Sequence, residues 1–210
     1  MKEALETPYS RCIFREVFSD EQSVRRNGGV PTDVNFNNGV GGFNASTSFI
    51  EYSRFIKGTY SIRARLKNFK KRINNSFLFI SLTGGTGHIY FNSEGTLTVS
   101  SGTRYVDGVA ESNCPDGDIE VVVTGISLDL IKFYLGRHTS SLEYHFLDSD
   151  IDLFEIYDGV LTPSEVKNLY RNSWAKELVS SNLLLDYDST NGYITDRTGK
   201  NTLTPTDVSI

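Results

Sequence analysis

Alternating apolar and polar positions mark the clearest strand of this chain, between Gly58 and Leu66. Such a period of two is typical of an antiparallel strand that buries only one of its faces. We therefore expect the polar face, which carries two arginines, to lie away from the core. The apolar face holds Tyr60, Ile62, Ala64 and Leu66, and the polar face holds Thr59, Ser61, Arg63 and Arg65.

Similar alternation, or short apolar runs between Gly- and Asn-rich turns, predicts strands along most of the chain. Residues 21–40 are polar and glycine-rich, which predicts a loop with one short strand at 34–36. Many short strands and one terminal helix predict an all-β fold, a two-sheet antiparallel β-sandwich. The other predicted strands are 11–18, 46–52, 58–66, 76–82, 88–91, 96–100, 104–106, 119–124, 128–135, 142–147, 150–157 and 183–187.

A short helix is predicted to begin after Thr162. Thr162 is a suitable N-cap, Pro163 suits the first helical position, and Glu165 completes a capping box. Leu161 and Val166 form the hydrophobic staple that often accompanies such a box. An apolar stripe at helical spacing must dock on a sheet, because so short a helix cannot bury it alone. The stripe consists of Val166, Leu169, Tyr170 and Trp174.

The length of 210 residues suits one large domain or two small ones. We predict a β-sandwich over residues 1–175. Residues 176–210 are predicted either to close the sandwich with further strands or to begin another module. The tetrapeptide at 31–34 recurs at 205–208, which is weak support for a repeat.

Charge and hydropathy narrow the partners and the setting. The net charge of −5 does not suit wholesale binding to phosphate backbones, so no nucleic-acid partner is expected. No apolar run reaches the roughly 18 residues of a membrane span, so no membrane insertion is expected. Residues 1–12 lack the apolar core of a signal peptide. We therefore expect a cytosolic product, a protein exported by another route or carried on a virus particle, or part of a longer chain.

Cysteine usage gives little structural information. Cys12 and Cys114 are the only two cysteines, and they lie far apart in the sequence. Two cysteines do not make a disulfide framework. Buried free thiols are the main interpretation, and a single bridge between the two is the alternative.

One block of the chain resembles a known family. It runs from Asp150 to Tyr170 and reads DIDLFEIYDGVLTPSEVKNLY. An Ile-Asp strand, an Ile-Tyr pair and a capped helix ending in Leu-Tyr resemble the closing signature of laminin-G-like, concanavalin-A-like jelly rolls. Segments 43–52 and 59–66 are compatible with the opening strands of that family, whereas Leu135 replaces its usual Asn. The resemblance implies a two-sheet sandwich that recognises sugars, proteins or surfaces, and it does not specify a ligand.

The same broad fold hosts glycoside hydrolases, which need two carboxylates. Asp150, Asp152 and Glu155 resemble the acidic strand motif of one such hydrolase family, with Asp150 in place of a glutamate. A period of two puts Asp150 and Asp152 on one face and Glu155 on the other unless a bulge intervenes. We therefore expect no catalytic residues and predict that the chain is not an enzyme, with hydrolysis by Asp150 and Glu155 as the alternative.

No cofactor or metal is expected from the residues, and calcium is the alternative that the resemblance suggests. Calcium takes oxygen ligands from loop carboxylates and carbonyls, and several aspartates lie near predicted turns. The three histidines have no partner at metal-ligand spacing and are interpreted as ordinary strand and turn residues. The aspartates are Asp107, Asp116, Asp118, Asp148 and Asp150, and the histidines are His88, His138 and His145.

These observations predict a non-enzymatic recognition or structural module that binds a glycan or a protein surface. Its setting is expected to be extracellular or on a virion, as an adhesin segment or as part of a larger oligomeric assembly. A glycoside hydrolase of concanavalin-A-like fold is the alternative. Ligand-binding residues are not assigned, although exposed tyrosines can stack on sugar rings. The candidates for stacking are Tyr52, Tyr90, Tyr105 and Tyr144.

Overall fold

The computed structural model describes residues 8–44, 46–81, 87–138, 146–182, 186–188 and 193–195. It divides into two units, Met1–Leu169 and Tyr170–Ile210. Helix α2 (Pro163–Asn182) begins in the first unit and ends in the second. In the second unit, β12 (Asp186–Asp188) pairs with β13 (Tyr193–Thr195). The predicted boundary at residue 175 and both alternatives for residues 176–210 stay predictions. No helix in the described part of the chain is long and apolar enough to span a membrane.

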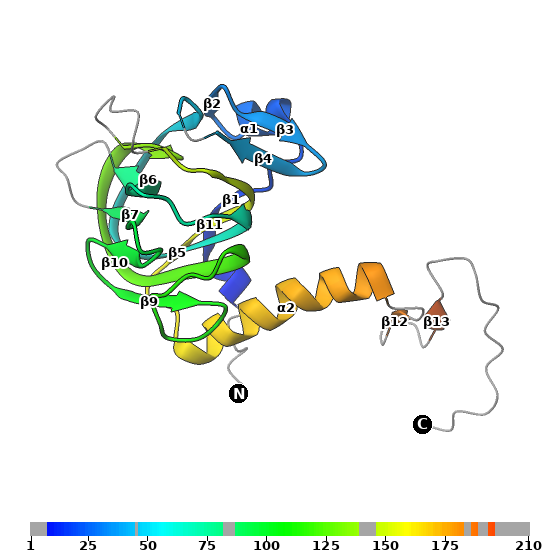
Figure 1. Ribbon diagram of the computed structural model, residues 1–210. Helices are drawn as coiled ribbons and strands as arrows, with labels where there is room; N and C mark the ends of the chain where they lie inside the picture. The colour runs from blue at the N-terminus through cyan, green and yellow to red at the C-terminus, as the bar shows by residue number, and fades with distance from the viewer. Residues whose placement is uncertain are drawn as a thin grey trace. The chain divides into compact units, whose positions relative to one another are not determined.

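Two long strands form the centre of the first unit. β5 (Phe49–Phe69) and β10 (Gly117–Leu135) pair along almost their whole lengths. The sheet order is β3-β4-β11-β5-β10-β6-β7-β8, with β1 beside β11, β2 beside β5 and β9 beside β10 (Figure 1). The shorter strands are β1 Cys12–Glu16, β2 Gly29–Thr32, β3 Asn35–Asn37, β4 Val40–Phe43, β6 Ser76–Ser81, β7 His88–Phe91, β8 Leu97–Val99, β9 Thr103–Val106 and β11 Ser149–Asp158.

Aromatic contacts show that this sheet folds over on itself. Phe79 of β6 and Phe154 of β11 lie on strands that β5 and β10 separate, yet their rings stack with centroids 6.0 Å apart. Phe14 of β1 meets Tyr52 of β5 edge-on at 5.1 Å. The two halves of the sheet therefore face each other across one apolar core. The predicted antiparallel β-sandwich is confirmed.

Each long strand was predicted as two short ones, because the alternation fails where the strands bend. The register between β5 and β10 shifts between Thr124 and Ile126 and again between Leu130 and Lys132. Such irregularities bend a strand and increase its twist. Gly125 takes a φ of 76° at the first shift, a conformation that favours glycine. The bends let each strand serve both halves of the sandwich.

The region predicted as a loop at 21–40 contains more regular structure than expected. Helix α1 (Glu21–Arg26) begins after Asp20, whose carboxylate accepts the Ser23 N–H at 2.6 Å. Arg25 pairs with Glu21 at 2.6 Å, one helical turn away. The aspartate cap and this pair were the sequence signals for α1. Strand β2 was also missed, because glycine and proline suggested a turn.

The cysteines are free thiols, so the alternative of a single bridge is wrong. Cys114 is buried and Cys12 is half-buried. Burial raises the pKa of Cys12 to about 11 and that of Cys114 to about 12. Both thiols are therefore protonated at neutral pH and behave as small apolar side chains.

A second apolar cluster covers the outer face of the sheet, opposite the main core. Here Leu161, Val166 and Leu169 pack on the sheet, so the predicted docking of the helix is confirmed for these residues. Trp174 falls outside the residues whose side chains are described. The arginine-bearing face of β5 lies away from the main core, as expected, but Ser61 and Arg63 on it are buried because the start of α2 covers them. The sheet residues of this cluster are Tyr105, Val122 and Tyr157, with Cys12 beside them.

The start of α2 has the predicted capping box. The Thr162 N–H donates to Glu165 Oε2 at 2.7 Å, and the Glu165 N–H donates to Thr162 Oγ1 at 3.3 Å. Arg11 also pairs with Glu165. Partial burial raises the pKa of Glu165, but the bonds from Thr162 and Arg11 outweigh it and hold the pKa below its usual value.

We expect Glu165→Gln to lower the free energy of unfolding at pH 7 by about 0.5–1 kcal/mol, because Gln keeps an acceptor for the Thr162 N–H but loses the charge that pairs with Arg11 and favours the helix N-terminus. A carboxylate whose pKa is lower in the folded state stabilises the fold above its unfolded pKa of about 4.5, and this contribution disappears as the pH falls. Urea unfolding should therefore show the two proteins converging as the pH falls below about 4.5. The exposed Glu94→Gln is the control, and a difference for Glu165→Gln that stays constant with pH would contradict the assignment.

Candidate functional site

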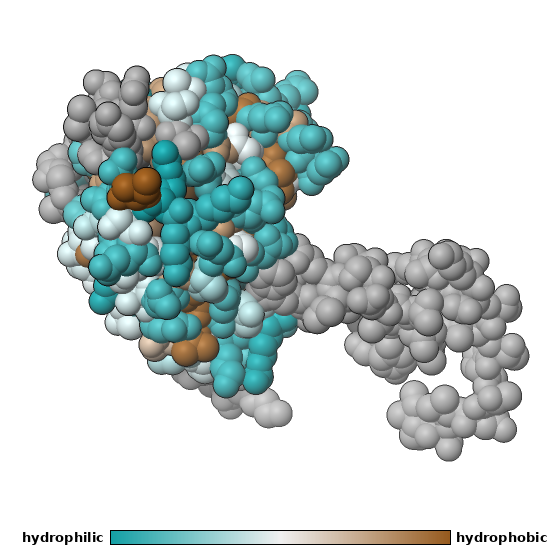
Figure 2. All heavy atoms as spheres, in the orientation of Figure 1, coloured by the Kyte–Doolittle hydropathy of each residue, from teal (hydrophilic) through white to brown (hydrophobic). Residues whose placement is uncertain are grey.

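An open polar pocket of about 430 Å³ lies at one end of the sandwich. Three adjacent strands, β11, β5 and β10, supply its charged groups, and the β3–β4 hairpin supplies most of its amides. The surface over this hairpin is largely hydrophilic (Figure 2). The pocket is lined by Asn35, Asn37, Asn38, Val40, Gly42, Lys67, Asn68, Asp118 and Asp150.

Asn68 joins the two carboxylates of this pocket. Its side-chain Nδ2 donates to Asp150 Oδ2 at 2.9 Å, and its backbone N–H donates to Asp118 Oδ1 at 3.1 Å. Lys67 Nζ lies 3.0 Å from the other oxygen of Asp118. The end of β5 therefore holds one carboxylate from each neighbouring strand in a defined orientation.

Backbone conformation explains why these residue types stand here. Asn38 and Asn68 have φ values of 53° and 55°, in the left-handed region that asparagine tolerates better than most residues. Gly42 pairs with Asp150 across β4 and β11, and a Cβ at Gly42 would lie 3.0 Å from Asp150 Oδ1. The pocket thus depends on a missing side chain in its wall and on two asparagines with left-handed backbone conformation, Asn38 in the β3–β4 turn and Asn68 near the end of β5.

The charges of the pocket favour an ionised Asp118. Partial burial raises the pKa of Asp118, but the Asn68 N–H and the Lys67 ammonium outweigh it and hold the pKa below its usual value. Asp118 is therefore a hydrogen-bond acceptor at neutral pH. Lys67 is a donor, and asparagine side chains are both donors and acceptors. Such a set is suited to a ligand rich in hydroxyl groups, each of which donates and accepts.

The pocket brings together two of the five aspartates considered for calcium, Asp118 and Asp150. They do not fit the roughly six to eight oxygen ligands that calcium takes, because the Lys67 ammonium already lies beside Asp118. No group of three or more His, Cys, Asp or Glu side chains in the described ranges could hold a metal ion. Calcium binding stays a prediction.

The predicted hydrolase pair, Asp150 and Glu155, does not share this pocket. A register shift between Ile151 and Leu153 intervenes in β11, so Glu155 lies on the same face of the sheet as Asp150. Glu155 is nevertheless fully buried, and Tyr157 Oη donates to its Oε2 at 2.5 Å. Asp152 accepts Arg65 Nε at 2.8 Å. The partner of Asp150 in the pocket is Asp118, which lies 32 positions earlier (150 − 118) and which the search for a strand motif therefore missed.

Arg63 explains why two glutamates can be buried on this face. Its Nη1 lies 2.9 Å from Glu155 Oε2 and its Nη2 lies 2.8 Å from Glu120 Oε2. Nη2 also donates to the Leu169 carbonyl at 3.2 Å, which attaches α2 to the sheet. Burial lowers the pKa of Arg63, but Glu120 and Glu155 outweigh it and the pKa is raised. This cluster is structural, since it has no opening to solvent.

The candidate stacking tyrosines are mostly inside the protein. Tyr52 is buried in the main core and its hydroxyl donates to Glu16 at 3.0 Å, while Tyr105 is buried under α2. Tyr90 is half-buried and stacks on Phe77 with centroids 4.9 Å apart. Tyr144 lies outside the described residues.

The histidines can be placed in part. His138 contacts Phe77, with ring centroids 4.6 Å apart, and His88 contacts Tyr90 at 5.6 Å. Burial lowers the pKa of His88. His88 lies in strand β7 and His138 lies in the turn after β10, as predicted. His145 lies outside the described residues.

Comparisons with known proteins give fold neighbours and no family. No family model and no curated protein matches the chain. The Trypanosoma rangeli sialidase matches with a TM-score of 0.57 and 12% identity over 80% of this chain and 33% of the sialidase. The same sialidase in complex with sialic acid gives 0.56 and 13% over 81% and 34%. Domain 4 of AbnA, a GH43 extracellular arabinanase from Geobacillus stearothermophilus in complex with arabinotriose, gives 0.45 and 18% over 76% and 98%.

These matches correct one expectation. The prediction that the chain is not an enzyme is contradicted, because the solved structures that share its fold are those of sialidases, which are enzymes. At this level of identity the likeness shows the fold alone. The chain spans about a third of the length of the sialidases that it matches. One of these sialidase structures holds sialic acid, and no family model supports the laminin-G-like assignment itself.

We expect Arg63→Met to lower the free energy of unfolding at pH 7 by about 3–5 kcal/mol, because Glu120 and Glu155 would lose their buried cation and the exposed Arg15, 3.5 Å from Glu155 Oε1, replaces it only in part. Denaturant unfolding at pH 7 measures this. Arg65→Met, two residues along the same face, is the control and should cost only about 1–2 kcal/mol. Equal losses for the two variants would contradict the role of Arg63.

Proposed function

We propose that this chain binds a glycan in the pocket of Asp118, Asp150 and Asn68, as the β-sandwich part of a carbohydrate-active protein. The observation that carries the proposal is the bridge made by Asn68, which presents two oriented carboxylates to one open pocket. Sugar hydroxyls are recognised by such fixed acceptors and by neighbouring amide donors. The space left by Gly42 gives a ligand access to Asp150.

The fold supports the ligand class without specifying the sugar. The sandwich is shared with proteins named for acting on or binding carbohydrates. Folds host many functions, so the argument for this chain rests on the pocket. A laminin-G-like identity, protein-surface binding, assembly into an oligomer, and an extracellular or virion setting stay predictions.

A second candidate function is glycoside hydrolysis in the same pocket. It is favoured by the presence of two carboxylates, since retaining hydrolases use one as nucleophile and the other as acid/base. The low pKa of Asp118 suits the ionised role of nucleophile or base. Asp150 would then be the proton donor to the leaving group. This pair replaces Asp150 and Glu155, because Glu155 is buried against Arg63.

We expect Asp150→Asn and Gly42→Ala each to weaken glycan binding at least tenfold, or about 1.4 kcal/mol. The first replaces a carboxylate oxygen by an amide nitrogen, which donates where Asp150 accepts, and the second fills the space beside it. A glycan array identifies the ligand, and isothermal titration calorimetry measures the affinity of each variant. Asp158→Asn, exposed at the far end of the same strand, is the control. Unchanged affinity in both pocket variants, or no glycan bound by the unaltered protein, would defeat the proposal.

The hydrolase candidate requires turnover of a bound glycan. If it is correct, Asp118→Asn and Asp150→Asn should each reduce product release at least a thousandfold while Asp158→Asn has no effect. Reducing-end release, followed by mass spectrometry of the products, measures this. Binding without any product from the unaltered protein would eliminate hydrolysis and leave the binding proposal intact.

A further inference from the structure

The middle of β5 has an edge that no described strand covers. On the side opposite β10, β2 pairs with residues 49–52 of β5 and β11 pairs with residues 60–67. Between them, residues 53–59 face no strand in the part of the chain that the structure describes, although the Thr59 carbonyl accepts the Gly159 N–H at 3.1 Å and the Lys57 carbonyl accepts the Tyr60 hydroxyl at 3.0 Å. Within 53–59, all residues except Ile56 are exposed. Alternate residues of such an edge present backbone N–H and C=O groups to solvent.

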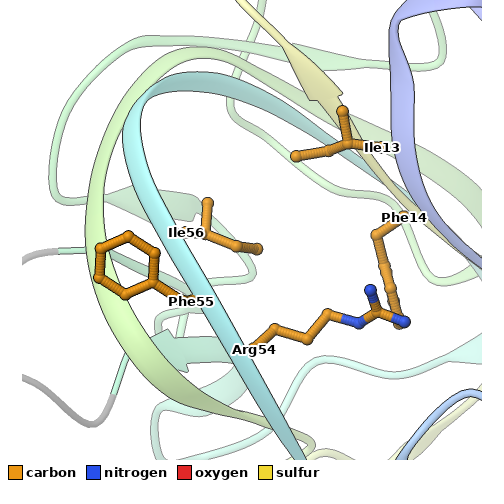
Figure 3. Close-up of a pocket in the computed structure, with 5 residues that line it drawn as sticks. All are labelled: Ile13, Phe14, Arg54, Phe55 and Ile56. Atoms are coloured by element: carbon orange, nitrogen blue, oxygen red, sulfur yellow. The ribbon is translucent and has the colours of Figure 1, made fainter.

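A pocket of about 430 Å³ opens beside this edge. Ile13 and Phe14 of β1 line one wall, and Arg54, Phe55 and Ile56 of β5 line the other. Figure 3 shows Ile56 and Arg54 pointing toward Phe14 and Ile13, whereas the Phe55 ring points away on the other side of β5. Four of the five residues that line the pocket are apolar, and Arg54 adds one guanidinium.

Arg54 is a cation without an anionic partner in the described residues. Its guanidinium lies 4.7 Å from the centroid of the Phe14 ring, and its Nη2 donates to the Asn27 carbonyl at 3.3 Å. The neighbouring cations on these strands are paired, as Lys57 is with Asp129 at 3.1 Å and Lys132 is with Glu51 at 2.6 Å. Stacking on Phe14 orients the guanidinium and leaves N–H groups for a carboxylate.

We propose that an extended, acidic peptide segment of a partner protein binds this edge as an added antiparallel strand. β11 ends opposite Tyr60 and β2 begins opposite Tyr52, and both run antiparallel to β5. A short antiparallel segment opposite residues 53–59 fits the gap between them and bonds to the backbone groups that Gly159 and Tyr60 leave unpaired. One apolar side chain enters the pocket of Phe14 and Ile56, and an acidic side chain pairs with Arg54.

The edge and the pocket together favour a peptide over a sugar. Backbone groups at strand spacing match a peptide main chain, which is the basis of β-strand addition. The pocket beside them offers apolar side chains and a single cation, in contrast to the carboxylates and amides of the glycan pocket. The proposal does not rest on glycan binding, since no residue lines both pockets.

The test uses the full chain and a display library of hexapeptides with blocked ends. We expect enrichment of peptides that combine alternating apolar residues with Asp or Glu, and dissociation constants come from fluorescence anisotropy of the enriched sequences. Arg54→Glu should weaken binding at least tenfold, and replacing the acidic residue of the peptide by Lys should restore it in that variant. Arg26→Glu, an exposed arginine of α1, is the matched control and should have no effect. Asp150→Asn should also leave peptide affinity unchanged, which separates this proposal from the glycan pocket.

Amide hydrogen exchange then locates the bound peptide. Binding should slow exchange within residues 53–59, and a peptide with N-methylated backbone amides should bind at least tenfold more weakly. The proposal is overturned if no peptide is enriched, if Arg54→Glu has no effect, or if charge reversal in the peptide fails to restore binding. It is also overturned if these amides already exchange slowly in the free protein, or if only small carboxylates or acidic sugars bind at Arg54.

Discussion

The pairing of β5 with β10 is the interaction on which the rest of this structure depends. The two strands stay paired while both bend, so one ladder contributes to both halves of the sandwich. Most of the other strands attach directly or indirectly to this ladder. Its end, at Asn68 and Asp118, forms the polar pocket, and its bend, at residues 53–59, leaves the uncovered edge. Both proposed binding sites are therefore consequences of how far this one pair extends.

The outer face of the ladder shows how a buried charge is tolerated. Arg63 would be costly under a helix, but Glu120, Glu155 and the Leu169 carbonyl supply its partners. The same carboxylates would be costly without Arg63, so the three groups are stable only together. Because the arginine reaches the backbone of α2, this cluster also fixes where the start of the helix lies. Glu155, which the sequence suggested as a catalytic group, therefore has a structural role.

Glycan binding and peptide binding call for different surfaces, and this sandwich provides one of each. The polar pocket offers ionised and amide groups held by Asn68, and it lies at a strand end where short connections supply the wall. The Arg54 pocket offers an apolar wall beside exposed backbone, and it lies at a strand middle.

The sequence by itself determined the local features: the alternation within β5, the turns, and the capping box at Thr162 and Glu165. These depend on residues within a few positions of each other, so their physics is contained in a short stretch. Only the tertiary structure decided that Arg63 would be buried, that Glu155 would be its partner, and that Asp118 would meet Asp150. Those outcomes depend on strand order and register, which bring together residues far apart in the chain. An alternating pattern shows that a strand has two faces, but whether the polar face meets water depends on what packs over it.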